Sequence, residues 1–194
     1  MTSPAAARGR EVRQQLLAAA VELIPERGWT AVSTRVLAER AGVTPSVVHY
    51  HFPSLPALLR EAVVGLLRQV LAEMDAVLDT ARTPADAVDA MLASVDQYTG
   101  ADPMSLLSIE AYLVATRDEQ LREQIAGLVA GFRQRFGRWL GERGVAAPEE
   151  TAAVLGAAVD GLLLQRGLGA GPDAGAVAAV LRRLVSDEAR HRRK

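Results

Sequence analysis

The sequence predicts an all-α fold. Almost every segment of the 194-residue chain repeats its apolar residues at the spacing of an amphipathic helix, and no run alternates like a half-buried strand. Prolines, glycines and capping residues divide this pattern into nine helices with short connections. With 49% hydrophobic and 23% charged residues, the chain has the composition of a globular protein that buries a real core.

The first predicted helix ends near Gly28, which is a suitable C-terminal cap. Ser33 is a suitable N-cap for a short second helix, which stops at Gly42. The first helix carries one apolar stripe, formed by Val12, Leu16, Ala19, Ala20, Leu23 and Ile24.

A third helix begins after Thr44, with Pro45 at the first helical position, where the missing N–H costs nothing. It ends near Phe52 because Pro53 disfavours a helical residue before it. Ser54 then caps a long fourth helix.

The fourth helix runs to about residue 79, and five more helices follow it. The last of them comes after the Gly-rich turn GLGAGPDAG and extends to about residue 190. The other four are predicted at 84–98, 103–116, 119–143 and 148–168.

The third helix follows the second through Ala41-Gly42-Val43, which is a helix-turn-helix in outline. At about 100° per residue, a helical wheel on which Val48 faces the core places Phe52 within about 40° of it. His51 then lies on the flank. The side chains that project outward are Ser46, Val47, His49 and Tyr50.

Two interpretations of this outward face remain open from the helix pattern alone. A valine can contact a thymine methyl and a serine can bond a base edge, so the face suits a DNA major groove. The same residues also fit the ordinary surface of a short packed helix, since helix-turn-helix geometry occurs in proteins that never meet DNA.

Charge is uneven along the chain, although the total is only −1. The first sixty residues hold seven arginines and four glutamates, a net charge of +3, and the remainder carries −4. A basic end attracts phosphate, but a solvated helical face produces the same pattern.

There are no cysteines, which excludes disulfides and cysteine-based zinc sites. No segment approaches 18 uninterrupted apolar residues, and the first residues lack the apolar stretch of a signal peptide, so we expect a soluble cytoplasmic protein without a membrane partner. His49 and His51 stand about 160° apart on a helix and do not form a metal pair. No catalytic motif is present, and we expect no enzyme activity, metal or cofactor.

The stretches RGREVRQQLLAAAVELIPERGW and STRVLAERAGVTPSVVHYHFPSLPALL resemble the N-terminal DNA-binding domain of the TetR family of transcriptional repressors, collinearly from about Arg8 to Leu59. LAERAGV and HYHFPS followed by ALL are the most specific parts, and DGLLLQRGL is similar to the penultimate helix of many members. The resemblance implies a helix-turn-helix DNA-binding domain at residues 1–54 and a ligand-binding and dimerisation domain at residues 55–194.

The resemblance also implies contacts with double-stranded DNA. Ser33 would cap the second helix and bond a phosphate, and Arg35 would reach a phosphate or a base edge. The other contacts would come from Thr44 with phosphate, from Pro45, Ser46 and Val47 with bases, and from His49, Tyr50 and His51 with the backbone or thymine methyls.

Family members often have Lys-Gly where this chain has Pro45-Ser46, and Lys-Glu where it has Leu55-Pro56. The missing lysines remove two phosphate contacts. We therefore expect affinity to depend on three arginines in a disordered N-terminal arm, namely Arg8, Arg10 and Arg13.

The last two helices are rich in small residues, which let helix backbones approach closely. Their apolar stripes either cap the core or pair with a second copy of the chain, and the resemblance favours the four-helix interface of a homodimer. Such a dimer would place its recognition helices about 34 to 36 Å apart, matching successive major grooves. The small residues are Ala152, Ala153, Gly156, Ala157 and Gly161 in one helix and Ala176, Ala178 and Ala179 in the other.

The middle helices carry methionines and aromatic residues at helical spacing. On spacing alone this set is core, but in the proteins that the sequence resembles such residues line an apolar cavity enclosed by helices four to eight. Glu110 stands on an apolar segment, where a carboxylate needs a partner, recognises a cationic or hydroxylated ligand, or lies at the rim in water. The predicted ligand-binding residues are Met74, Met91, Tyr98, Glu110, Leu113, Phe132, Phe136 and Trp139.

The predicted function is that of a repressor which binds a pseudo-palindromic operator as a dimer. A small apolar or amphipathic effector would release it by shifting the fourth helix, which joins both domains. The alternative is a helical ligand-binding or adaptor protein that kept this fold but no longer binds specific DNA.

Overall fold

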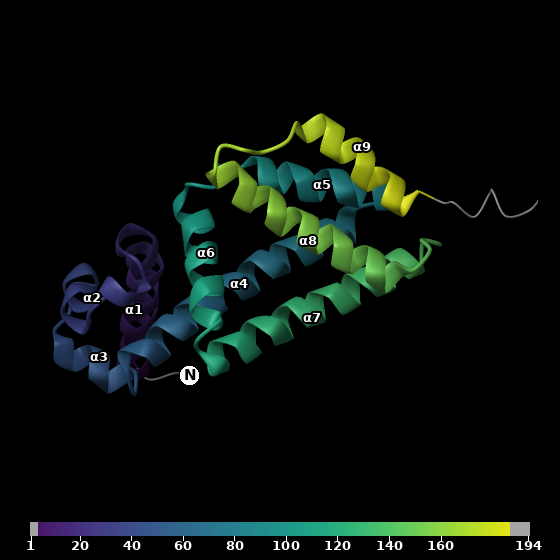
Figure 1. Ribbon diagram of the computed structural model, residues 1–194. Coiled ribbons are helices and arrows are strands. Elements are labelled where there is room, and N and C mark those ends of the chain that lie inside the picture. Colours follow the sequence, from purple (N-terminus) through teal and green to yellow (C-terminus); the bar gives the residue numbers. More distant parts are fainter. Residues whose placement is uncertain (1–3, 187–194) are drawn as a thin grey trace, which may run out of the picture. The chain divides into compact units, whose positions relative to one another are not determined.

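A computed structural model describes residues 4–186 of the chain (Figure 1). These residues form nine α-helices and one short 3-10 helix, and no β-strand occurs among them. In chain order the helices are α1 (Pro4–Arg27), η1 (Trp29–Ala31), α2 (Thr34–Arg40), α3 (Pro45–His51), α4 (Leu55–Thr80), α5 (Pro84–Asp96), α6 (Pro103–Ala115), α7 (Glu119–Gly141), α8 (Pro148–Gly167) and α9 (Ala174–Val185).

The all-α fold and the nine predicted helices are confirmed, and most of them begin at the predicted caps. The Ser33 hydroxyl accepts from Val36 N at 3.3 Å, and the Ser54 hydroxyl accepts from Ala57 N at 3.2 Å. The 3-10 helix η1 was not predicted from the apolar pattern, because three residues are too few to show a period.

Two predictions about the ends of the chain are wrong. The helix α1 already begins at Pro4, so the arginines expected in a disordered arm lie on a helix. The helix α9 ends at Val185, because Ser186 has an extended backbone with φ −78° and ψ 140°. The rest of the predicted continuation, residues 187–190, lies outside the described part of the chain.

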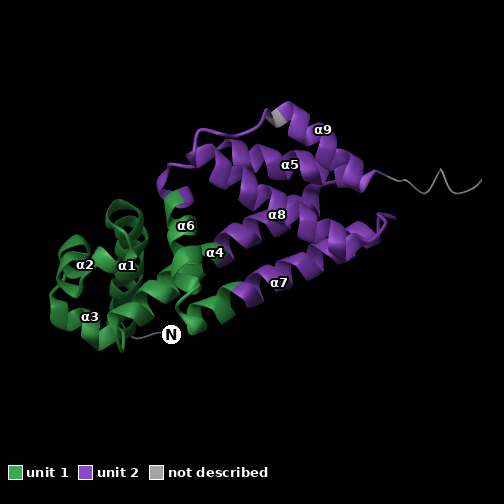
Figure 2. Cartoon of the chain, viewed as in Figure 1, with its two compact units in different colours: residues 1–67, 106–125 green, residues 68–105, 126–194 purple. Residues whose placement is uncertain are grey.

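The chain divides into two compact units, which Figure 2 colours separately. The N-terminal unit comprises residues 1–67 and 106–125, and the C-terminal unit comprises residues 68–105 and 126–194. The helices α4, α6 and α7 each contribute residues to both units. These units differ from the predicted division at residue 54. That division separates DNA binding from ligand binding and dimerisation, and it stays a prediction.

The N-terminal unit has its core among the short helices, where α1 packs on α2 and α2 packs on α3. Every apolar residue of the predicted stripe of α1 from Leu16 onward is buried. Leu37 of α2 is fully buried, and Val48 of α3 is 1% exposed. The buried residues that α4 and α6 add to this unit include Leu58, Leu59, Ala62, Val63, Leu107 and Ala111.

The C-terminal unit is held by one apolar cluster and by arginines at its edges. Val88 of α5, Phe136 of α7 and Leu155 of α8 are at most 1% exposed and belong to the cluster. Arg182 of α9 donates to Asp89 of α5 at 2.7 Å. A surface pair of this kind adds little to stability by itself, so the apolar cluster carries most of the packing energy.

One close backbone contact fixes the end of α8 in the C-terminal unit. A Cβ added to Gly100, whose φ is +80°, would stand 2.0 Å from the nitrogen of Gly167. Arg166 donates to the backbone oxygen of Val95 at 2.6 Å and pairs with Asp96. The guanidinium therefore caps the C-terminal end of α5, where helix carbonyls lack partners.

Every helix within residues 4–186 is too short or too polar to cross a lipid bilayer.

Candidate nucleic-acid interface

The turn between α2 and α3 is built around Gly42. Its φ of +68° is a conformation that glycine adopts without steric cost. Val43 N donates to the Ala38 carbonyl at 2.9 Å, which closes the end of α2. This turn leaves α3 free to present one face to solvent.

The helix α3 has the orientation that its sequence predicts. Val48 is 1% exposed and Phe52 is 3% exposed, so this side anchors α3 to the core. Tyr50 on the opposite side is 85% exposed. Of the other predicted outward residues, Ser46 and His49 are exposed and Val47 is half-buried, while His51 is half-buried on the flank.

The predicted cap of α3 is present in its backbone but not in its side chain. Thr44 has the extended conformation of an N-cap, and its carbonyl accepts from Val47 N at 3.0 Å. Its hydroxyl makes no capping bond and instead lies 2.8 Å from the Ser46 hydroxyl. Both hydroxyls are exposed, so they keep hydrogen-bonding capacity for another molecule.

The seven arginines of the first sixty residues do not form one basic surface, because several are paired. Arg40 of α2 donates to Glu26 at 2.6 Å and to Glu22 at 3.0 Å. These hydrogen bonds raise the pKa of Arg40 above its ordinary value, and the bond from Arg40 lowers the pKa of Glu26. Arg60 is bonded to Asp118 at 2.8 Å.

Arg13 also has a structural role, contrary to its predicted place in a flexible arm. Its two terminal nitrogens donate to the Glu61 carboxylate of α4, and its guanidinium lies over the Phe52 ring. Arg8 and Arg10 of α1 are exposed, as is Arg35 of α2, and none of the three forms an ion pair with a described residue. Arg27, at the end of α1, is likewise exposed and outside every ion pair among the described residues, so four of the seven arginines are left for an external anion.

The predicted effector residues fall into both units. Met91 and Phe136 are buried in the apolar cluster of the C-terminal unit, and Met74, Phe132 and Trp139 pack against it. The Phe132 and Phe136 rings are 5.9 Å apart, and the Phe136 and Trp139 rings are 6.4 Å apart. Their packing is that of a core, and their role in ligand binding stays a prediction.

Three predicted effector residues lie outside this cluster. Tyr98 is half-buried just after α5, and its carbonyl accepts from Arg166 at 3.3 Å. Leu113 belongs to the N-terminal unit and is 58% exposed. Glu110 belongs to the same unit, and its carboxylate accepts from the backbone of Trp29 at 3.2 Å, so it has the partner that its place on an apolar segment requires.

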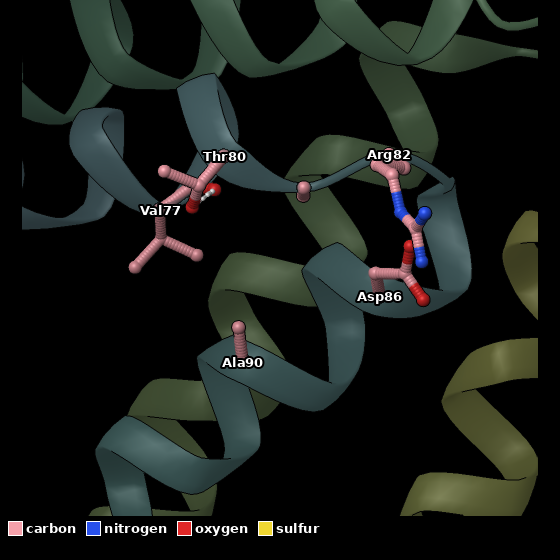
Figure 3. A pocket seen from close by; sticks show the side chains of 6 residues that line it. Val77, Thr80, Arg82, Asp86 and Ala90 are labelled. Carbon is pink, nitrogen blue, oxygen red and sulfur yellow. Dashed lines mark hydrogen bonds between the residues drawn. The ribbon is translucent and has the colours of Figure 1, made fainter.

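Two surface hollows of the C-terminal unit contain none of the predicted effector residues. Figure 3 shows the first, of about 300 Å³, where α4 turns into α5 beside Val77, Thr80 and Ala90. Asp86 on its edge has a lowered pKa, chiefly because of the nearby Thr83 hydroxyl and further because the Thr83 backbone N–H donates to its carboxylate at 3.0 Å in a capping box. The second, of about 200 Å³, lies between α4 and α7.

The outer side of α8 and α9 is apolar and exposed. On α8, Val154 and Leu164 are half exposed, and Leu168, just after α8, is 75% exposed. On α9, Val180 and Leu184 are 48% and 42% exposed. Their neighbours on α9, Leu181 and Val185, are buried in the apolar cluster of the C-terminal unit.

Two family models match the chain. The model described as "Bacterial regulatory proteins, tetR family" matches residues 16–62, and the one described as "Tetracyclin repressor-like, C-terminal domain" matches residues 82–187. The second match alone spans more than half of the chain.

Known proteins of similar sequence and structure include several transcriptional regulators. The HTH-type transcriptional regulator BetI of Rhizobium meliloti is 28% identical over 166 residues, which are 82% of this chain and 80% of that protein. The structure of a transcriptional regulator from Streptomyces coelicolor is 30% identical, with a TM-score of 0.74 over 91% of this chain and 99% of its own. A regulator from Saccharomonospora viridis, solved in complex with choline, has a TM-score of 0.73 at 22% identity over 92% of this chain and 97% of its own.

Proposed function

Because this chain belongs to the TetR family of transcriptional regulators, we propose that it is a repressor which binds a pseudo-palindromic operator as a homodimer and leaves it when a small molecule binds. The family places the chain among regulators and not among enzymes. Its operator, its oligomeric state and its effector are parts of the proposal.

The observation that carries the proposal is the polarity of α3. A helix of seven residues buries Val48 and leaves the Tyr50 ring 85% exposed. Exposing a large ring has no benefit in water, whereas an exposed tyrosine can stack on a sugar or donate to a phosphate in the major groove. The exposed hydroxyls of Thr44 and Ser46 at the start of the same helix add hydrogen-bonding groups beside it.

We assign base contacts to the start of α3 and phosphate contacts to its flanks. Pro45, Ser46 and Val47 are the proposed base-contacting residues, since the N-terminal residues of a recognition helix reach the base edges. The remaining proposed contacts, to the phosphate backbone or thymine methyls, come from Ser33, Arg35, Thr44, His49, Tyr50 and His51. Arg8 and Arg10 are further candidates for phosphate, because they are exposed and form no ion pair with any residue that the structure describes.

The exposed side of α8 and α9 supports the proposed dimer. Val154, Ala157, Gly161, Leu164 and Leu168 follow one another at spacings of three and four residues, which is the pattern of a helix that packs along a partner helix. Exposed apolar surface of this extent is unfavourable in a monomer. Two copies joined here would bury it in a four-helix interface.

The proposed effector is small and apolar or amphipathic. The ring cluster around Phe136 offers apolar surface, and its neighbour Trp139 already carries the Arg143 guanidinium at 3.8 Å over its ring face. The choline bound in the Saccharomonospora viridis regulator is an example of a small molecule held by this fold, in a protein of only 22% identity. An effector releases DNA only to the extent that it binds the DNA-free conformation more tightly.

A selection of genomic fragments followed by footprinting tests the proposal. Purified protein is incubated with fragments of its own genome, and bound fragments are sequenced and footprinted at several salt concentrations. A protected palindrome with half-sites one helical turn apart is the expected result. Retention of fragments without a common sequence would contradict the proposal and favour the adaptor alternative.

A further inference from the structure

The backbone N–H of Trp29 donates to the Glu110 carboxylate at 3.2 Å, across 81 positions of the chain. Both residues belong to the N-terminal unit, which Figure 2 draws in one colour. We infer that Glu110 of α6 is a positioning residue for DNA binding, which holds η1 and through it the start of α2. This inference goes beyond the proposed function and rests on it.

The corner between α1 and η1 leaves the Trp29 N–H without a backbone partner in its own turn. Gly28 N closes α1 by donating to Ile24 O at 2.8 Å, and Ala31 N closes η1 by donating to Gly28 O at 3.2 Å. The first amide of a helix has no such partner within its own turn. Glu110 supplies the acceptor for Trp29 N, so a residue of α6 caps η1 from outside.

The geometry of the corner makes this cap effective. Gly28 has φ +83° and ψ 150°, so the chain turns sharply there and aims the next amide away from α1. A Cβ built on Gly28 would lie 3.9 Å from Glu110 Oε1, which shows how near the carboxylate is to the turn. A bond between a carboxylate and a backbone N–H is charge-assisted and stronger than a neutral one.

The segment that Glu110 holds leads directly to the proposed DNA contacts. Only Val32, which is 5% exposed, separates η1 from Ser33. Ser33 caps α2 through Val36 N, and Arg35 stands in the first turn of α2. A shift of η1 would therefore move the residues proposed to bind phosphate.

The C-terminal end of α6 is joined to α4 within the same unit. Asp118, in the turn after α6, accepts from Arg60 of α4 at 2.8 Å. The same carboxylate caps α7 by accepting from Leu121 N at 3.0 Å. Thus α6 is attached both to η1 and to α4, and it provides a route to the DNA-binding residues that does not depend on α4 alone.

The test compares Glu110→Ala with Glu110→Gln, whose amide oxygen still accepts a hydrogen bond. Glu123→Ala is the matched control, because Glu123 is an exposed carboxylate of the same unit. Operator affinity is measured by filter binding at several salt concentrations, and backbone amide exchange of residues 29–31 is measured in the DNA-free protein.

We expect Glu110→Ala to weaken operator binding about tenfold, which corresponds to losing one charge-assisted hydrogen bond. Its salt dependence should stay that of wild type, because Glu110 contacts no phosphate. Glu110→Gln should lose clearly less affinity than Glu110→Ala, because its amide oxygen still accepts the hydrogen bond, although without the charge. Removing a negative charge from the protein should by itself strengthen DNA binding, and Glu123→Ala measures the size of that gain. A loss of operator affinity in Glu110→Ala has the opposite sign, so charge removal cannot explain it.

Faster exchange of the Trp29 amide in Glu110→Ala, restored in Glu110→Gln, supports the inference. Wild-type affinity together with unchanged Trp29 exchange in Glu110→Ala overturns it, and so does a Gln variant as weak as the Ala variant. If Glu110→Ala unfolds, Glu110→Leu keeps the volume without the acceptor and gives the same comparison. The exchange measurement needs no DNA, so it separates a failure of this inference from a failure of operator binding.

Discussion

The guanidinium of Arg13 lies over the ring of Phe52, with 4.6 Å between its central carbon and the ring centroid. Phe52 is the C-cap that follows α3, and Arg13 stands in α1. The pair therefore fixes the end of the proposed recognition helix against α1. The same guanidinium donates to the Glu61 carboxylate of α4 through both of its terminal nitrogens.

This contact predicts different outcomes for two neighbouring arginines. Arg13→Ala should lower the free energy of unfolding by about 1 kcal/mol, since the ion pair is partly exposed and the cation–π contact adds a comparable amount. It should leave the salt dependence of operator binding unchanged. Arg10→Ala should leave stability unchanged and reduce the salt slope by about one, as for a lost phosphate contact. Urea unfolding and filter binding measure the two quantities, and a lower salt slope for Arg13→Ala would place Arg13 on the DNA.

Substitutions on the exposed face of α3 and α2 should separate DNA binding from folding. Tyr50→Ala and Arg35→Ala should weaken operator binding while the free energy of unfolding changes by less than about 0.5 kcal/mol, as for exposed positions in general. Tyr50→Phe is the matched control, because it keeps the ring and removes only the hydroxyl. Wild-type affinity in both alanine variants at all salt concentrations would show that this face does not bind DNA.

The free energy of unfolding should depend on pH through the carboxyl of Asp118. Its pKa lies below the ordinary value, chiefly because Leu121 N–H bonds to the carboxylate and further because Arg60 donates to it. A carboxyl with a lowered folded-state pKa stabilises the fold above the unfolded pKa of about 3.9, and this contribution is lost as the pH falls through the folded value.

Asp118→Asn should therefore be less stable than wild type by about 1 kcal/mol at pH 7, because Asn keeps the cap but loses the charge. The difference should shrink in urea unfolding as the pH is lowered below the unfolded pKa of about 3.9, because the wild-type carboxyl then gains its proton. Glu119→Gln, at an exposed position beside it, is the control and should match wild type. A difference of the same size at neutral and at low pH would exclude the charge as its cause.

If the exposed apolar side of α8 and α9 forms the dimer interface, a charged residue placed there should disrupt the dimer. Leu164→Glu and Val180→Glu should shift the protein from dimer to monomer in sedimentation velocity, because an unpaired carboxylate in an apolar interface is costly. Circular dichroism should stay that of wild type, since both side chains are about half exposed in the single chain. Leu106→Glu, at another exposed leucine on α6, should leave the dimer intact. A monomeric wild-type protein would contradict the proposed dimer outright.

Two glycines with positive φ should respond differently to alanine. Gly42→Ala should cost about 1 kcal/mol of unfolding free energy, because only the backbone conformation is strained and no atom lies within 4 Å of the new Cβ. Gly100→Ala should cost at least about 2 kcal/mol more, because its Cβ would also overlap the backbone of Gly167. An equal loss of unfolding free energy in the two variants would mean that the segments around Gly100 and Gly167 can move apart without destabilising the fold.

The sequence predicted the helices well because their signals are local. These signals act within a few residues, so they can be recognised from the sequence alone. They are proline at a first helical position, Ser33 as a cap and Gly42 after α2. The orientation of α3 follows from the same local geometry, since one buried residue fixes where the others point. The start of α1 also had a local signal in Pro4 followed by three alanines, which are strong helix formers.

The pairing of charges was beyond the sequence because it joins distant positions. Arg13 and Glu61 are 48 residues apart, and Trp29 and Glu110 are 81 residues apart. Counting arginines gave a basic N-terminal end, but it could not tell Arg40, which is held by two glutamates, from Arg35, which is not. The apolar pattern likewise could not separate residues that fill the core from residues that line a ligand site, because both need the same side chains.

The chain contains two tryptophans, and each lies in a different unit: Trp29 at the corner held by Glu110, and Trp139 beneath the Arg143 guanidinium. Intrinsic fluorescence therefore reports on both halves of the molecule without an attached dye. Replacing Trp139 by phenylalanine would leave one emitter beside the DNA-binding helices, and replacing Trp29 would leave one beside the apolar cluster. The protein thus carries its own pair of optical probes for following operator and effector separately.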